Sequence, residues 1–391
     1  MALLVIAQFL VGLADQIYII TIPFLVISIE IYNASLKAGI VSFIETLPFL
    51  TISFLAGILA DRYNKKYLLI ISVLFSGLFL LIIPIFSTIN KLNWIIIAIT
   101  GFLVSSFSTL YPPSRDALIP ILVKDKDKLF YYNAIVQSSY QFALFIGGLL
   151  PPIILYLKND LIFLILLDAI ILILTSFLIY PINYNENNFM NKKSSILDDI
   201  KSFISILKKE RSILNLVILT ALDNFFIMGL TTIGASLYIK NYLGLSAKEF
   251  ALFNALLSLG WFLSAIILSR IKIKTSEVNL LRWGIFLDGF TYIPFFFIND
   301  FKTSLIFIFI HGLVIPLITI SRTTLIQKHV GEEFRGKVFS LIYIAVIGFM
   351  SLSGLFMGIL GEFLSPNYLF LIGGIGGSII GIISFSLKIF N

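Results

Sequence analysis

Twelve apolar stretches, each long enough to cross a lipid bilayer, run through the 391-residue chain, and most are separated by short polar segments. A transmembrane helix needs about 20 predominantly apolar residues, because the hydrocarbon core is about 30 Å thick. The stretches show no alternation of polar and apolar residues, so we expect helices and not a β-barrel. The predicted spans are residues 2–27, 36–60, 67–88, 93–112, 131–156, 161–181, 212–238, 246–270, 280–298, 302–320, 338–360 and 367–388.

The composition fits a membrane protein and excludes several other classes. Of all residues, 59% are hydrophobic and 13% are charged, and this charged share is about half that of a soluble domain. The chain has no cysteine and two histidines, His311 and His329, so we expect no disulfide, no metal site and no other cofactor. The net charge of +7 fits basic cytoplasmic loops, and we expect no nucleic-acid partner.

The distribution of Lys and Arg predicts how the chain crosses the membrane. If both termini are cytoplasmic, the segments on that side hold 21 of the 28 basic residues and the opposite segments hold 6, with Arg282 inside a span. Cytoplasmic loops carry the excess of basic residues. We therefore predict a multi-pass protein of the cell membrane with both termini in the cytoplasm. The first span lacks a preceding basic region, so we interpret it as a retained helix.

One long polar segment, residues 182–211, separates residues 1–181 from residues 212–391. It opens with the polar run NYNENNFMNKK, and Ser195 and Asp198 match a helix-capping pattern ahead of apolar residues at helical spacing. The segment therefore predicts a short amphipathic helix on the cytoplasmic surface. Its alternative role is that of a plain linker between two six-helix halves.

Several sequence features recur at nearly one offset in the two halves. SRDALIPILV begins at Ser114 and SRTTLIQKHV begins at Ser321, an offset of 207. Asp15 and Asp223 are 208 residues apart, and Ser35 and Ser246 are 211 apart. Matches in the same order at a similar period indicate duplication of a six-helix unit. Two related halves leave a binding cavity at their interface, and their rocking gives alternating access.

A charged cluster, GILADRYNKK at positions 57–66, separates spans 2 and 3. The cluster, the twelve spans and the central polar segment resemble the major facilitator superfamily, whose signature at this place reads roughly Gly-x-Leu-Ala-Asp-Arg-x-Gly-Arg-Arg. Asn64 stands where the signature has its second glycine. More narrowly, LADQIYIITIPFLV, RDALIP and GEEFRGKVFSL resemble the bacterial and archaeal drug-exporter branch, which includes macrolide and siderophore exporters. The resemblance implies an all-α membrane fold with two pseudo-symmetric halves.

The charged cluster predicts a gate on the cytoplasmic side. Gly57 and Asp61 lie four residues apart and share one helix face, and a glycine lets another helix approach closely. Asp61 can then meet Arg115 at the end of span 4, or the N-terminus of span 11, where the helix dipole favours negative charge. An ordinary basic loop explains the cations but neither Gly57 nor Asp61. The predicted gating residues are Gly57, Asp61, Arg62, Lys65 and Arg115, and the resemblance implies that they stabilise the outward-open state.

Three carboxyl groups within the predicted spans are candidates for proton coupling. An ionisable residue at the bilayer centre costs about 2.5–3.5 kcal/mol on insertion scales, so it normally faces a cavity or a partner. Asp15 shares a polar helix face with Gln8 and Gly12, and the resemblance places spans 1, 2 and 7 at the cavity. The alternative is a carboxyl bonded to a nearby Ser or Tyr with no role in transport. The candidates are Asp15, Glu45 and Asp223.

Further polar side chains within the spans either bind substrate or hold helices together. The candidates for the cavity are Gln8, Asn133, Gln137, Gln141 and Asn224. The resemblance makes spans 6 and 9 peripheral, so Asp168, Asp288 and His311 are expected to have structural roles, with Asp288 paired to His311.

Together these features predict a secondary active transporter that exports a small amphipathic or hydrophobic compound in exchange for protons. Exporters often carry Gly-x-x-x-Gly-Pro-x-x-Gly-Gly on span 5, whereas this chain has FIGGLLPPII from Phe145; uptake or facilitated transport of a metabolite or lipid is therefore the alternative. The sequence contains no Asp or His cluster of a polytopic membrane enzyme and no Gly-x-x-x-x-Gly-Lys-Ser/Thr loop for ATP. We expect a monomer whose partners are a small-molecule substrate and membrane lipid.

Overall fold

The computed structural model describes residues 1–30, 32, 34–123, 125–158, 160–183, 210–245, 247–271 and 275–390. The regular structure of these residues is helical, and they contain no strand. The amphipathic helix expected around Ser195 and Asp198 lies outside the described residues and stays a prediction, as does the division into halves at this linker.

Each of the twelve predicted spans coincides with one helix or with a run of consecutive helices. In the described part of the chain, nine helical stretches are long and apolar enough to cross a bilayer, and α2 (Ala34–Thr51) with α3 (Ser53–Arg62) makes a tenth, bent by 44°. The other two predicted spans correspond to α8 (Leu129–Lys158) and α14 (Glu277–Phe290). The latter is short because the chain continues as a 3₁₀ turn, Ile293–Phe296, which contains Pro294.

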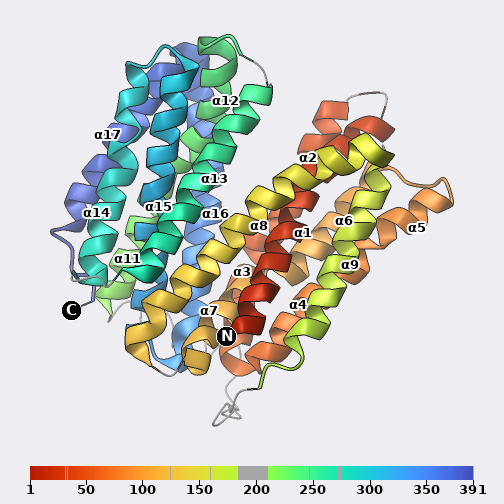
Figure 1. The fold of residues 1–391 in the computed structure, drawn as a ribbon, viewed down its shortest axis with the longest axis horizontal. Coiled ribbons are helices and arrows are strands. Elements are labelled where there is room, and N and C mark those ends of the chain that lie inside the picture. Colours follow the sequence, from red (N-terminus) through yellow and green to blue (C-terminus); the bar gives the residue numbers. More distant parts are fainter. Residues whose placement is uncertain are drawn as a thin grey trace. The chain divides into compact units, whose positions relative to one another are not determined.

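The chain divides into two compact units, and the first comprises Met1–Lys124, Ser139–Lys193 and Glu332–Ser340. In this unit α1 packs against α9, α4 packs against both α9 and α6, and α2 packs against α6 (Figure 1). The unit also takes in the second part of α8 and the beginning of α16. Its remaining helices are α1 (Ala2–Ile29), α4 (Lys65–Leu80), α5 (Ile82–Thr88), α6 (Trp94–Ser108), α7 (Tyr111–Val123) and α9 (Leu161–Ile179).

The second unit comprises Asp125–Ser138, Ser194–Gly331 and Leu341–Asn391. Here α15 packs against α13 and α14, and α17 packs against α14 and α11. The core is rich in aromatic rings, among them Tyr238 and Phe295. The elements are η1 (Lys126–Lys128), α11 (Arg211–Gly229), η2 (Leu230–Gly234), α12 (Ala235–Leu237), η3 (Tyr238–Tyr242), α13 (Ala247–Arg270), η4 (Ile293–Phe296), α15 (Phe301–His329), α16 (Glu332–Phe363) and α17 (Pro366–Ser384).

Polar residues between the apolar stretches cap the N-termini of several of these helices. The first amide groups of a helix have no partner within it, and an Asn or Asp side chain before the helix satisfies them. Asn64 accepts hydrogen bonds from the amides of Lys66 and Tyr67 at the start of α4. Asn64 thus caps a helix at the position where the family signature has a glycine. Asn93, Asp160 and Asp300 cap α6, α9 and α15 in the same way.

Two segments expected as cytoplasmic loops are helical. Residues 113–130 contain most of α7, and residues 321–337 contain the end of α15 and the beginning of α16. Pro112 and Pro113 fall in the first turn of α7, where a proline removes no helical hydrogen bond. Hydropathy indicates where a helix leaves the apolar region and not where the helix ends, so helical structure continues beyond the predicted span ends at residues 112 and 320.

Beyond the end of α1, Glu30 connects three helices of the first unit. Its carboxylate accepts a hydrogen bond from the ammonium group of Lys37 on α2 and another from the amide of Trp94 at the start of α6, at 3.2 Å. The hydrogen bond from Lys37 lowers the pKa of Glu30 below its ordinary value. This contact fixes one end of α1 relative to α2 and α6.

Candidate functional site

Gly57 and Asp61 of α3 both contact the beginning of α16. A Cβ atom added at Gly57 would lie 2.4 Å from Oγ of Ser340 and 2.5 Å from the carbonyl oxygen of Gly336, so only glycine allows this approach. One turn later, Oδ1 of Asp61 accepts the amide of Gly336 at 2.6 Å. Oδ2 of Asp61 accepts both the amide and the Nζ of Lys337, each at 3.1 Å.

The counter-charge of Asp61 comes chiefly from a side chain and not from a helix terminus. Gly336 and Lys337 lie in the second turn of α16, which begins at Glu332, and the helix dipole acts mainly within the first turn. The side chains of Asp61 and Lys337 are 2% and 1% exposed. A buried ion pair of this kind needs additional hydrogen bonds to offset its desolvation, and the two amides supply them. Sequence reasoning missed Lys337, which it counted only as a basic loop residue.

The other predicted gating residues have different surroundings. Lys65, at the first position of α4, is buried and its Nζ lies 3.9 Å from Oε1 of Glu332, a second connection to the beginning of α16. Arg62 is the last residue of α3. Arg115 is buried in α7, where its Nε donates to Oδ1 of Asp116 at 2.7 Å and its Nη1 donates to Oε1 of Gln8 at 3.0 Å. Two partners were expected for Asp61, Arg115 and the beginning of span 11. The contacts described above join Asp61 to the beginning of span 11, which is α16.

The polar face of α1 contacts α7 and α8. Oδ2 of Asp15 accepts a hydrogen bond from the hydroxyl of Tyr140 at 3.0 Å. Gly12, nearly one turn earlier, lets α8 approach: an added Cβ would lie 2.9 Å from the Cβ of Ala143. Arg115 bonds to Gln8 and also interacts electrostatically with Asp15. The three residues of the predicted stripe therefore do share one face, which meets an arginine and a tyrosine from other helices.

Glu45 is bound by α1 and packed against α6. Its Oε1 accepts the hydroxyl hydrogen of Tyr18 at 2.7 Å. A Cβ atom added at Gly101 of α6 would lie 2.5 Å from the same oxygen, so the glycine leaves room for the carboxyl. Asp168 of α9 is 1% exposed, and neither of its oxygens has a hydrogen-bond partner among the described residues. It interacts electrostatically with Asp15 and Tyr18.

In the second unit, α11 repeats part of this arrangement. Asp223 is buried, and its Oδ1 has no hydrogen-bond partner in the described part of the chain. Arg322 of α15 interacts electrostatically with Asp223, and its Nη1 lies 3.5 Å from Oγ1 of Thr220. Asn224 donates to the carbonyl oxygen of Thr220 at 2.7 Å. Arg322 therefore reaches α11 as Arg115 reaches α1, in accordance with the offsets of the repeat.

The three cavity candidates on α8 are divided between the two units, Asn133 and Gln137 in the second and Gln141 in the first. Nδ2 of Asn133 donates to Oγ1 of Thr324 at 2.9 Å and to Oε1 of Gln327 at 2.6 Å, so it joins α8 to the end of α15. Gln137 is half-buried and Gln141 is buried. Thr324 and Gln327 were not predicted as functional residues, although both lie in the repeated segment that begins at Ser321.

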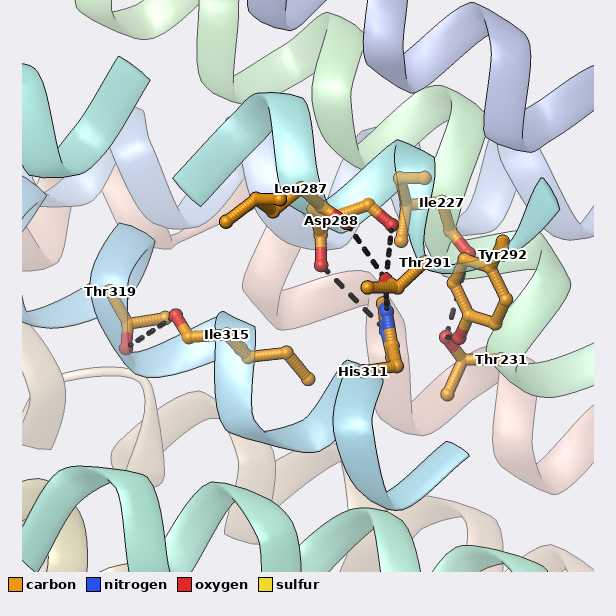
Figure 2. Close-up of polar contacts among 9 residues, drawn as sticks. All are labelled: Ile227, Thr231, Leu287, Asp288, Thr291, Tyr292, His311, Ile315 and Thr319. Atoms are coloured by element: carbon orange, nitrogen blue, oxygen red, sulfur yellow. Dashed lines mark hydrogen bonds and ion pairs between the residues drawn. The ribbon is translucent and has the colours of Figure 1, made fainter. Parts of the chain in front are cut away.

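Asp288 and His311 lie together inside the second unit (Figure 2). Nε2 of His311 is 3.7 Å from Oδ1 of Asp288, and Nδ1 of His311 is 2.9 Å from Oγ1 of Thr291. The ring of Tyr292 lies 4.0 Å from that of His311, and its hydroxyl is 2.8 Å from Oγ1 of Thr231. Among the described residues, no group of three or more His, Cys, Asp or Glu side chains could hold a metal ion.

Comparisons with known proteins identify the family. Residues 4–354 match the model of the Major Facilitator Superfamily. The chain is 23% identical over 392 residues to the uncharacterized MFS-type transporter YfiS of Bacillus subtilis (strain 168). The aligned region covers 97% of this chain and 90% of YfiS.

Solved structures show the same fold. The fucose:proton symporter FucP of E. coli matches with a TM-score of 0.78 and 16% identity over 98% of this chain and 97% of FucP. The human organic anion transporter MFSD10 matches with a TM-score of 0.79 and 12% identity over 98% of each chain. The chain therefore belongs to the major facilitator superfamily, and it is an all-helical, multi-pass secondary transporter and not an enzyme.

Proposed function

We propose that this transporter exports a small amphipathic or hydrophobic compound in exchange for protons. The observation that carries the proposal is the environment of Asp15: a carboxyl in the middle of α1 that bonds to Tyr140 and interacts with Arg115. A carboxyl within a membrane span is a functional candidate because its insertion is costly. The repeated pair of Asp223 and Arg322 supports a second site of the same kind.

The direction of transport rests on the resemblance to drug exporters. The fold is also that of a fucose:proton symporter, so uptake is the second candidate. We place the protein in the cell membrane as a monomer with both termini in the cytoplasm, as the basic loops predict. Polar residues proposed to line the substrate cavity are Gln8, Asn133, Gln137, Gln141 and Asn224.

The contacts between α3 and α16 are proposed to form the cytoplasmic gate. Three hydrogen bonds, one of which is also an ion pair, connect Asp61 to Gly336 and Lys337. Asp61→Asn removes the charge that faces the buried Lys337, which costs about 3–5 kcal/mol when one partner of a buried pair is lost. We expect spin-label distances across the gate to show a larger open population and transport to be slower. Unchanged distances in a variant that folds normally would exclude a gating role.

The substrate is found by a stabilisation screen of the purified protein, because a ligand that binds the native state raises the melting temperature. Inside-out vesicles with an imposed pH gradient then measure accumulation of the ligand. We expect Asp15→Asn to abolish gradient-driven accumulation and to leave counterflow exchange intact, because exchange needs no net proton movement. Asp125→Asn, on the exposed turn before α8, is the matched control.

The same assay separates the alternatives. Accumulation driven by a gradient of the opposite sign would indicate uptake. Retained accumulation in Asp15→Asn, Asp223→Asn and the double variant would show that neither aspartate couples protons, and Glu45 would then be tested.

A further inference from the structure

Asp288 and His311 are buried side chains whose facing polar atoms have no hydrogen-bond partner among the described residues. Asp288 is 5% exposed and His311 is 0% exposed. Oδ1 of Asp288 and Nε2 of His311 face each other at 3.7 Å, and neither atom has a hydrogen-bond partner among the described residues. Buried polar atoms almost always have such a partner. Each atom therefore has the other as its nearest available partner.

Thr291 determines which nitrogen of His311 carries a hydrogen. The Thr291 hydroxyl has a single hydrogen, and its carbonyl acceptors are the backbone oxygens of Leu287 at 2.8 Å and Asp288 at 3.2 Å, common bonds to the preceding turn. Oγ1 of Thr291 then accepts from Nδ1 of His311 at 2.9 Å. This leaves a lone pair on Nε2, directed at the carboxyl of Asp288 (Figure 2).

Two lone pairs that face each other in an apolar interior repel, so this tautomer favours a proton between Nε2 and Oδ1. It resides on Asp288 as a carboxylic acid or on His311 as an imidazolium, and the pair is neutral overall in both states. In the other tautomer, with hydrogen on Nε2 alone, the ionised Asp288 gives the pair a net negative charge, which is costly when buried and depends on Arg322 for its balance. The distance of 3.7 Å closes to a hydrogen bond by a small side-chain movement or through one bridging water.

The groups around the pair include a second carboxyl and an arginine. Asp223 of α11 and Arg322 of α15 both interact electrostatically with Asp288. The phenol of Tyr292 lies against the imidazole and bonds to Thr231. The charged residues of α13 lie near its ends, η4 has no titratable side chain, and α17 has Tyr368 near its beginning. Two carboxyls, one arginine and one shared proton leave this group without net charge.

We propose that Asp288 and His311 share one proton and exchange it with Asp223, so that the pair acts as a proton store for the second unit. In the exchange, the O–H or N–H bond of the pair breaks and an O–H bond forms on Asp223. Arg322 balances whichever carboxyl is left ionised. The inference rests on the proposed proton-coupled function, and it gives the pair a role that the sequence alone presented as structural.

Histidine NMR tests the shared proton directly. The chain has two histidines, so His329→Gln leaves one imidazole in the full-length protein, and ¹⁵N labelling reports its two nitrogens separately. We expect hydrogen on Nδ1 and an Nε2 signal that changes with pH in one step. Asp288→Asn should remove that step, because an amide donates to Nε2 permanently. Hydrogen fixed on Nε2 at every pH, with the same signals in Asp288→Asn, would overturn the proposal.

Proton counting and transport separate this inference from the proposed function. In a pH jump of the detergent-solubilised protein, Asp288→Asn and His311→Gln should each take up about one proton fewer than the wild type over the range of the step. In vesicles both variants should lose pH-driven accumulation at least tenfold. Unchanged accumulation in both would overturn the exchange with Asp223. If the NMR step is present but the wild type responds to no pH gradient, the proposed function fails and the shared proton remains.

Discussion

Gly57→Ala provides a sharp test of the contact between α3 and α16. The added Cβ would lie 2.4 Å from Oγ of Ser340 and 2.5 Å from the carbonyl oxygen of Gly336. The second atom belongs to the backbone, so a rotamer change cannot relieve the contact and the helices must separate. Overpacking of this kind costs about 1–3 kcal/mol. Such a cost changes a two-state equilibrium by roughly five- to 150-fold.

Cysteine labelling measures this separation. The chain has no cysteine, so Ser340→Cys places a single thiol in the contact, at a position that is 1% exposed. We expect Gly57→Ala to raise the rate of maleimide labelling by the same five- to 150-fold range. Gly358→Ala on α16, the helix that carries Ser340, is the matched control, because an added Cβ there meets no atom within 4 Å. Equal labelling rates in the two variants, with normal melting, would refute close packing at Gly57 as a determinant of the contact.

Two further predictions concern the first unit. Lys37→Met removes the hydrogen bond that lowers the pKa of Glu30. In the wild type this contact contributes stability above the ordinary glutamate pKa (about 4.3), and the contribution is lost as the pH falls through the lowered pKa. The variant lacks the contact, so its melting temperature should fall less than that of the wild type over this pH range, and an identical pH series would contradict this. Gly101→Ala places a Cβ 2.5 Å from both Oε1 and Cγ of Glu45, so it should break the hydrogen bond from Tyr18, cost about 1.5–3 kcal/mol and lower the melting temperature. In a Tyr18→Phe background the loss should be smaller, because only the steric part remains, and an equal loss in both backgrounds would contradict this.

The spans were predictable because the bilayer requires them. A long apolar stretch must form a helix, and its length is set by the membrane. The helical period likewise placed Gln8, Gly12 and Asp15 on one face, and the structure shows contacts from that face to α7 and α8. Local chemistry therefore sufficed for the elements and for the orientation of side chains on a single helix.

The partners of these side chains were not predictable, because they come from distant parts of the chain. Lys337 follows Asp61 by 276 positions, and no local pattern connects them. The sequence allowed both Arg115 and the beginning of span 11 as partners of Asp61, and only helix packing distinguishes the two. Tyr140 was missed because an aromatic residue in an apolar helix is typical of packing, and its hydroxyl gives no signal until α1 and α8 are placed together.

The two π-helical turns after α11, Leu230–Gly234 and Tyr238–Tyr242, explain an irregularity of the internal repeat. Asp15 and Ser35 are 20 positions apart, whereas their counterparts Asp223 and Ser246 are 23 apart. A π turn bonds each residue to the fifth one along and so contains one more residue than an α turn. The two turns thus accommodate two of the three extra residues without a longer loop. Each insertion rotates the following side chains by about 100°. An alignment of the two halves at a fixed offset therefore compares side chains about 100° apart beyond the first π turn, and nearly opposite faces of the helix only beyond the second.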